Sequence, residues 1–566
     1  MSKKSLIPIV LLSLLTVWSQ SQIISDNAKL LKAVAARGQA EVVITVSGVD
    51  DIRRLSRDYS IRSTGEKVVS LLLSPLTVER FISEGKSYLL KVEPAIKGEM
   101  TAASMARAIE WDVYPTLTQL DSILSSFASL YPSLCRLDTI GTSINGKTIL
   151  ALKISDNCLT DESEPEVFYS SSIHGDETGG MIMMLRLSDF LLRNYATDSR
   201  VKNLVDNLEI WINPLANPDG TYRNGDVISS PVRFNAAGYD LNRNFPDPEA
   251  PQVTLQKETI DMIRFMSGRR FVLSANFHSG EEVINYPWDR WPYEHADDDW
   301  FYTVSREWAD TVHLHAPQGY MDYLDNGVTR GYEWYSILGG RQDYVTYSLY
   351  GRELTVELDE DYITPVAELD DLWEYNYRSM LGYLENALFG IRGRITGFYD
   401  GKPVPAAIMT EGHDRDNSHV LSDTASGVFT RLISPGIYDL KISSGGFRDT
   451  IIRNVNVIPG ERTDIDIAMI PLVKPPDPTK ILTPFLYPNP GQGEVNVILP
   501  EGLTGSLNVK VFGINGKLLS DYEINAPEGE PMKLDLSNLG EGEYIIVFTS
   551  KTNRLSGTGK YVITLL

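Results

Sequence analysis

The chain has 566 residues, and at roughly 150 residues per domain this length predicts about four structural units. Hydrophobic residues make up 42% of the sequence and charged residues 22%, a balance that excludes a mainly disordered, collagenous or coiled-coil protein. The formal net charge of −23 disfavours general binding to nucleic acids and to anionic membranes.

The first residues, 1–22, have the order of a secretory signal peptide. Lys3 and Lys4 precede an apolar run at 6–18, and small and polar residues follow it. The run is too short to span a membrane, and no later stretch reaches about 18 unbroken apolar residues. We therefore expect an exported protein, secreted or at the cell surface, without a transmembrane segment. An anchored or cytosolic protein with a buried N-terminal helix is the alternative, and it explains the paired lysines poorly.

Residues 23–108 predict a small α+β unit. Its expected strands and helices alternate in the order β-α-β-α-β, at 41–46, 49–59, 68–73, 76–84 and 88–92. Strands and long helices then alternate through 110–388, which predicts an α/β domain whose open mixed sheet has helices on both faces.

The pattern changes after residue 390. Short strands divided by Gly, Pro, Asn and Asp predict a β-sandwich over 390–472. A proline-rich linker follows at 473–484, and 485–566 is again all-β. The predicted architecture is thus an α/β domain preceded by a small α+β unit and followed by two β-sandwich domains.

Cys135 and Cys158 are the only cysteines of the sequence, and they flank a predicted hairpin with the turn pair Asn145-Gly146. Such a hairpin would bring the two thiols nearly opposite each other. A disulfide and a pair of free thiols both fit this pattern in an exported protein.

Two histidines stand at the ends of predicted buried strands. His174 and Glu177 lie in a turn between a strand at 167–173 and a helix, and His278 ends a second strand. Because ligands bind at strand ends in open α/β sheets, the three side chains form a zinc set with one position left for water. Taken alone, the first motif fits equally well a capped helix start with a surface histidine. The remaining histidines are expected to be solvated: His295, His313, His315, His413 and His419.

Glu357 lies inside an apolar strand at 354–358. A carboxylate there is costly unless it is paired, so Glu357 is a functional candidate, and a structural ion pair with Arg352 is the alternative.

With the polar segments at 217–246 and 334–343, these motifs resemble the M14 zinc metallocarboxypeptidases (funnelins), most closely the regulatory branch of carboxypeptidases E, N, M and D, over 114–388. The resemblance implies one Zn²⁺ in the catalytic domain and a role for each matching residue. It makes His174, Glu177 and His278 the zinc ligands, and Asp240 the hydrogen-bond partner of His174. Glu357 would be the general base and acid, and Arg233 would polarise the scissile carbonyl. Asn242 and Arg243 would bind the terminal carboxylate of the substrate, and Tyr335 would close over the bound substrate.

Substrate preference follows from the same resemblance. Asp289 resembles the pocket acid that binds C-terminal Lys or Arg in the regulatory branch, and Gln342 fits that branch too. The alternative is that Asp289 caps a turn or pairs with Arg290.

The flanking units also resemble known domains. Residues 391–469 resemble a transthyretin-like β-sandwich, and 485–566 resemble the sorting domain of the type IX secretion system, with an ordinary adhesion sandwich as the alternative. Residues 23–108 resemble a carboxypeptidase activation segment only in element order. An inhibitory propeptide and a separate binding module therefore both stay open.

These features predict a secreted zinc exopeptidase that removes a C-terminal residue, preferably Lys or Arg, from peptides or proteins with a free C-terminus. The expected partners are that substrate and the secretion machinery, and no nucleic acid. Two alternatives are an amidase of the same fold acting on peptidoglycan stem peptides, and a secreted binding or adhesion protein with an inactive peptidase-like domain.

Overall fold

The computed structural model describes residues 27–91, 100–249, 253–472, 482–527, 530–551 and 555–564. The predicted signal peptide and residues 473–481 of the predicted linker lie outside these ranges. The chain divides at residue 469 into two compact units. No helix in the described ranges is both long enough and apolar enough to cross a membrane.

A small sheet with the strand order β2-β3-β1-β4 opens the first unit. Its elements are α2 (Asn27–Arg37), β1 (Ala40–Thr45), α3 (Val49–Leu55), β2 (Ser60–Thr64), β3 (Val68–Leu73), α4 (Val78–Ser83) and β4 (Leu89–Lys91). The strands predicted at 41–46 and 68–73 are confirmed. The helix predicted at 49–59 is too long, because it ends at Leu55 and the unpredicted strand β2 begins at Ser60. We call residues 27–91 the N-terminal unit.

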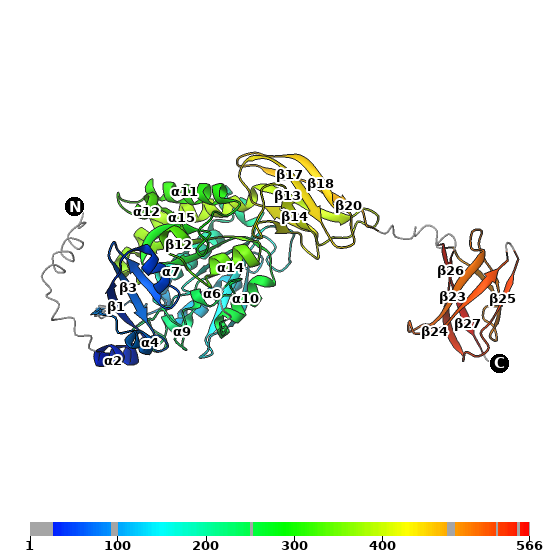
Figure 1. The fold of residues 1–566 in the computed structure, drawn as a ribbon, viewed down its shortest axis with the longest axis horizontal. Helices are drawn as coiled ribbons and strands as arrows, with labels where there is room; N and C mark the ends of the chain where they lie inside the picture. The colour runs from blue at the N-terminus through cyan, green and yellow to red at the C-terminus, as the bar shows by residue number, and fades with distance from the viewer. Residues whose placement is uncertain are drawn as a thin grey trace. The chain divides into compact units, whose positions relative to one another are not determined.

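The part of the chain that holds β12, α7 and α11 in Figure 1 is the predicted α/β domain, which we call the catalytic domain after the predicted resemblance. Its eight-stranded mixed sheet has the strand order β11-β10-β12-β9-β7-β8-β6-β5. Its strands are β5 (Cys135–Thr142), β6 (Thr148–Ile154), β7 (Glu166–Ser171), β8 (Glu209–Asn213), β9 (Phe271–His278), β10 (Glu281–Tyr286), β11 (Val328–Arg330) and β12 (Arg352–Asp359). The central strands β8, β7, β9 and β12 run parallel, so their carboxyl ends meet at one edge.

Helices cover both faces of this sheet, as the sequence predicts. One apolar core packs α6 (Leu117–Leu130), α7 (Gly179–Asn194), α8 (Ser199–Val205), α11 (Asp298–His313) and α15 (Leu369–Glu385) on the sheet. The other packs α10 (Lys257–Ser267) and α14 (Arg341–Ser348) on the opposite face. Shorter helices complete the domain: α5 (Met105–Ala108), α9 (Pro218–Thr221), α12 (Tyr323–Gly327), α13 (Gly331–Trp334), and the 3₁₀ helices η1 (Leu241–Arg243), η2 (Val366–Glu368) and η3 (Asn386–Leu388).

A β-sandwich ends the first unit. Its strands are β13 (Gly390–Gly397), β14 (Ala407–Thr410), β15 (Val420–Leu421), β16 (Val428–Arg431), β17 (Gly436–Ser443), β18 (Thr450–Val457), β19 (Arg462–Asp464) and β20 (Ile467–Met469). They form the sheets β16-β13-β19, with β20 beside β13, and β15-β14-β17-β18. These sheets enclose a core of their own.

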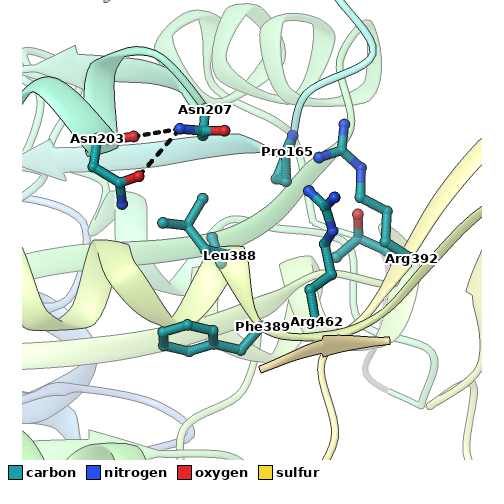
Figure 2. A pocket seen from close by; sticks show the side chains of 9 residues that line it. Pro165, Asn203, Asn207, Leu388, Phe389, Arg392 and Arg462 are labelled. Atoms are coloured by element: carbon teal, nitrogen blue, oxygen red, sulfur yellow. Dashed lines mark hydrogen bonds between the residues drawn. The ribbon is translucent and has the colours of Figure 1, made fainter. Parts of the chain in front are cut away.

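A cavity of about 220 Å³ lies where the sandwich meets the catalytic domain (Figure 2). Asn203 and Asn207 line one side, and Arg392 and Arg462 another. The guanidinium of Arg392 donates to the carbonyl of Ser163, and Arg462 pairs with a carboxylate of its own strand. Arg392 therefore links the sandwich to the catalytic domain, whereas the Arg462 pair lies within the sandwich.

The second unit is a separate β-sandwich. Its strands are β21 (Phe485–Tyr487), β22 (Glu494–Ile498), β23 (Gly505–Gly513), β24 (Leu518–Ala526), β25 (Met532–Asp535), β26 (Gly542–Ser550) and β27 (Ser556–Ile563). They pair as β21-β22-β25 and β24-β23-β26-β27 around one apolar core.

Two sequence expectations concern side chains outside the metal-binding motif. Cys135 and Cys158 are both buried free thiols. The prediction that His295 is solvated is wrong, because only 1% of it is exposed. His295 packs on Trp288 and Phe301, and its Nδ1 accepts a hydrogen bond from the backbone of Asp297.

Candidate active site

The turn after strand β7 positions the first two predicted metal ligands. Ser172 has a positive φ of 54°, and its hydroxyl donates to the carbonyl of Glu177 at 2.9 Å. At Gly175 an added Cβ would lie 2.4 Å from the backbone of Gly220, so only glycine fits. The turn therefore projects His174 and Glu177 toward the sheet edge where β9 ends at His278.

The donor atoms of these three side chains converge. His174 Nδ1 lies 2.9 Å from Glu177 Oε1, and His278 Nδ1 lies 2.7 Å from Glu177 Oε2. The two histidine Nδ1 atoms are 3.1 Å apart, and all three residues are buried. Tetrahedral zinc with Zn–N bonds of about 2.0–2.1 Å separates its ligand atoms by roughly 3.3 Å. The donor types and their spacing therefore fit a zinc ion.

The Nε2 atoms of His174 and His278, which face away from the three converging donor atoms, also have hydrogen-bond partners. His174 Nε2 lies 3.0 Å from Asp240 Oδ1, and His278 Nε2 lies 2.8 Å from the side-chain amide of Asn276. Burial alone would raise the pKa of Asp240, but the positive charges of Arg233 and His174 hold it well below its usual range. Asp240 is thus an ionised partner that can orient the His174 ring.

Arg233 is held beside the metal-binding residues. Its Nε donates to Asp240 Oδ2 at 2.9 Å and its Nη1 to Glu177 Oε1 at 3.1 Å. These contacts fix a buried guanidinium at the edge of the cavity.

Glu357 lies on β12 directly beside His278 of β9 in the parallel register. Among the described residues, no hydrogen bond or ion pair engages its carboxylate. The alternative pairing with Arg352 is wrong, since Arg352 Nη2 bonds to Asp297 Oδ2 at 2.6 Å. Burial, together with the negative charge of Glu177, raises the pKa of Glu357 well above its usual range.

Asn242 and Arg243 line the same cavity. Asn242 Oδ1 accepts a hydrogen bond from the backbone of Arg341 at 2.9 Å, and Arg243 Nη1 donates to the carbonyl of Asn242 at 2.9 Å. In the described part of the chain, the buried Nε and Nη2 of Arg243 have no hydrogen-bond partner. Two adjacent donors are therefore available to a ligand. Tyr335 is half-buried and borders this cavity as well.

Asp289 is buried at another wall of the cavity. The side-chain amides of Asn285 and Gln342 both donate to its Oδ1 at 3.0 Å. At Gly331 an added Cβ would lie 1.8 Å from that oxygen, so the backbone passes close to the carboxylate. Arg290 is not its partner, because that guanidinium pairs with Asp247 and Glu249. Burial raises the pKa of Asp289 to about 6.

The N-terminal unit closes this cavity. Strand β2 contributes four of its residues to the cavity wall, and the enclosed volume is about 40 Å³. Ser60 Oγ donates to Asp240 Oδ2 at 2.7 Å, and Gln39 Oε1 accepts from the backbone of Arg233 at 2.9 Å. The cavity in this form has room for only a few water molecules.

Comparison with known proteins assigns the family. Residues 120–379 match the zinc carboxypeptidase family, and 485–564 match a secretion system C-terminal sorting domain. Carboxypeptidase SOL1 from Arabidopsis thaliana is 33% identical over 349 residues, which are 59% of this chain and 68% of that protein. The chain belongs to the zinc carboxypeptidase family. The predicted resemblance to this family and to a sorting domain is thereby confirmed.

Other zinc carboxypeptidases differ from this chain in length. Human carboxypeptidase D is 32% identical over 361 residues, which are 60% of this chain but only 25% of that protein. The chain therefore matches about a quarter of the length of carboxypeptidase D. Among solved structures, the carboxypeptidase A of Helicoverpa armigera is 19% identical, with a TM-score of 0.49, and covers 62% of this chain and 97% of its own.

Three residues around the zinc carboxypeptidase site were not found from the sequence. Asp176 lies in the ligand turn and Tyr362 follows β12, and both contact Arg62 of the N-terminal unit. Asp176 stands inside the His174–Glu177 motif and could have been singled out there. Arg62 carried no signal, because only the packing of the two parts brings it to the site.

Proposed function

We propose that the protein is an exported zinc carboxypeptidase that releases a single C-terminal residue, Lys or Arg, from peptides or proteins. The observation that carries the proposal is one buried cavity that joins three convergent metal donors to the unpartnered donors of Arg243. The sorting domain at 485–564 supports export by secretion machinery.

The residues divide the hydrolysis between them. Zinc held by His174, Glu177 and His278 would supply a Lewis acid and lower the pKa of an attacking water. The Glu357 carboxylate accepts the proton of that water and returns it to the departing amine nitrogen. Its pKa is raised above the usual range, which makes the carboxylate a stronger base toward that proton.

Arg233 stabilises the negative charge that develops on the scissile carbonyl oxygen. Its guanidinium is already oriented by Asp240 and Glu177, so little reorganisation is needed when that charge appears. The arrangement favours the transition state over the ground state.

Arg243 selects the chain end. Its free Nε and Nη2 are adjacent donors on one planar group, which suits two-point capture of a carboxylate. An internal peptide segment offers no carboxylate there, and it would leave the buried guanidinium unpaired. This requirement restricts the enzyme to the last residue of a chain.

Asp289 favours a basic terminal side chain. A Lys or Arg side chain would pair with its buried carboxylate, whereas an apolar side chain would leave the charge without a partner. The two amides on Oδ1 hold the carboxylate in place without neutralising it.

The N-terminal unit keeps the site closed in this form, as a propeptide would. A 40 Å³ cavity cannot admit a peptide end, so substrate entry requires β2 to move away. The double variant Ser60→Ala/Arg62→Ala removes two contacts to the catalytic domain, and it should raise the rate of Lys release at least about tenfold over wild type.

The function is tested with peptides ending in Lys, Arg, Phe or Glu, with products identified by mass. We expect loss of one residue from the Lys and Arg peptides, abolished by a chelator and by Glu357→Gln. Glu360→Gln, at an exposed carboxylate on the same segment, is the matched control and should keep full activity. Asp289→Ala should remove the preference for basic ends.

Two results would overturn the proposal. Cleavage within a peptide would contradict capture of the free carboxylate by Arg243. Metal-loaded protein that releases no residue from any peptide, with the Ser60→Ala/Arg62→Ala variant included, would favour the binding-protein alternative.

A further inference from the structure

Asp176 is a buried carboxylate of the catalytic domain whose hydrogen-bond partners belong to the N-terminal unit. Only 1% of Asp176 is exposed. Its Oδ2 accepts from Arg62 Nη1 at 2.6 Å and from Gln39 Nε2 at 3.4 Å. Its Oδ1 is buried and has no hydrogen-bond partner among the described residues. Departure of the N-terminal unit would therefore leave this buried carboxylate without its side-chain hydrogen-bond donors.

Arg62 is held from two sides. Besides the pair with Asp176, its guanidinium lies 3.1 Å from the ring centroid of Tyr362. The Tyr362 hydroxyl donates to the backbone carbonyl of Arg62. A carboxylate combined with an aromatic face is a characteristic binding arrangement for a guanidinium or an ammonium group. The catalytic domain thus presents a receptor for a cationic side chain, which Arg62 fills.

This receptor lies apart from the pocket of Asp289. The side-chain hydrogen bonds to Asp176 come from Arg62 and Gln39. Those to Asp289 come from Asn285 and Gln342, so within the described part of the chain the two carboxylates share no side-chain hydrogen-bond donor. Arg62 nevertheless lines the same cavity as the metal donors. A peptide whose last residue enters the Asp289 pocket can therefore place a preceding side chain where Arg62 now lies.

We propose that Asp176 and Tyr362 form a second cation subsite, which binds a Lys or Arg side chain upstream of the scissile bond. Arg62 of the N-terminal unit occupies this subsite in the closed form. The inference rests on the proposed function, because it requires the peptide to enter with its terminal carboxylate at Arg243. The favoured substrates then carry two basic residues, one at the end and one shortly before it.

The kinetic test uses acetylated tetrapeptides that all end in Lys. In one pair of peptides, Arg or Gln stands directly before the C-terminal Lys. In a second pair, Arg or Gln stands two residues before the Lys, and the other positions are Ala. In full-length Arg62→Ala, the Arg peptide should exceed its Gln counterpart in kcat/KM by at least about tenfold at one position. In Arg62→Ala/Asp176→Asn that ratio should fall below about two. Arg80→Ala, which removes an exposed arginine paired with Asp58 on the same unit, is the matched control and should leave the site closed.

A binding measurement decides the matter independently of catalysis. N-acetyl-argininamide is added to full-length Arg62→Ala, and to Arg62→Gln in case the alanine variant does not fold. We expect a saturable rise in the unfolding temperature of about 3 °C at tenfold excess over Kd. Wild type, whose subsite is filled by Arg62, and Arg62→Ala/Asp176→Asn should show no rise.

The outcomes separate the two proposals. If no peptide loses its Lys while the arginine probe binds, the proposed function fails and the subsite stands. If Lys is released with an Arg-to-Gln ratio near one, and the probe does not bind, the subsite is overturned. A ratio that survives Asp176→Asn would also overturn it.

Discussion

Asp297 joins the sandwich to the strand that bears Glu357, and its substitution tests how far the first unit depends on that junction. Its carboxylate is fully buried. Oδ2 accepts from Arg352 at 2.6 Å and from Arg431 at 2.8 Å, and Oδ1 accepts from Arg431 at 2.8 Å. Arg352 is the first residue of β12, whereas Arg431 ends β16 of the sandwich.

The magnitude follows from what Asp297→Asn leaves behind. Arg431 keeps Asp414 at 2.6 Å, but Arg352 loses its carboxylate partner while buried. Removal of one partner from a buried ion pair costs about 3–5 kcal/mol. Asp439→Asn is the matched control: its arginine partner, Arg453, is 63% exposed, and such surface pairs contribute about 0–1 kcal/mol.

Tryptophan fluorescence in urea measures this loss selectively. All nine tryptophans lie at or before Trp373, so the signal reports on the first unit alone. With a slope of about 3 kcal/mol/M, the unfolding midpoint of Asp297→Asn should fall by about 1 M. A shift no larger than that of Asp439→Asn would refute the reasoning.

The effect has a defined pH dependence. Burial alone would raise the pKa of Asp297, but the charges of Arg431 and Arg352 lower it below its usual range. Because the folded pKa lies below the unfolded value of about 3.9, the stabilisation is complete at neutral pH and is lost as the pH falls below about 4. The difference between wild type and Asp297→Asn should therefore shrink in acid.

Three further predictions concern the active site. Glu357→Gln should lower kcat by about 10²–10⁴-fold with unchanged zinc content by atomic absorption, and a matching loss of zinc would contradict a role in proton transfer. Gly175→Ala should destabilise the turn that bears the metal ligands by about 1–3 kcal/mol and lower zinc occupancy, because the added Cβ would meet the backbone of Gly220. Gly445→Ala, where an added Cβ has open space, is the control and should have neither effect. Because the pKa of Asp289 is about 6, its carboxylate ionises as the pH rises, so the kcat/KM preference for Lys over Leu ends should grow about tenfold between pH 5 and 7. A preference independent of pH would remove Asp289 from the pocket.

The metal-binding site was accessible to sequence reasoning because it depends on strand ends. Apolar runs that terminate in His174 and His278 belong to parallel neighbours of the sheet, and such strands end at one edge. Glu357 was visible for a related reason, as a carboxylate within an apolar strand. Its position beside His278 needed the strand order, which the sequence did not provide.

The closure of the site was not accessible in this way. Strand β2 has the sequence Ser-Ile-Arg-Ser-Thr, with one large apolar residue, so its pattern resembles a loop. It is a strand because it pairs with β3 and packs against the catalytic domain. His295 was mispredicted for the same reason, since its burial depends on Trp288, Phe301 and the Asp297 junction rather than on its acidic neighbours in the chain.

The pairing of Arg62 with Asp176 links opening of the site to the charge of the substrate. In the closed form one carboxylate is neutralised by the N-terminal unit, and in the open form it must be hydrated or paired again. A peptide with a cationic side chain at this position competes with Arg62 for Asp176, so it binds and favours the open form through the same contact. A neutral peptide gains no such contact, and its apparent affinity is reduced by the fraction of molecules that are open. The N-terminal unit therefore acts as a competitor whose effect depends on the sequence of the peptide.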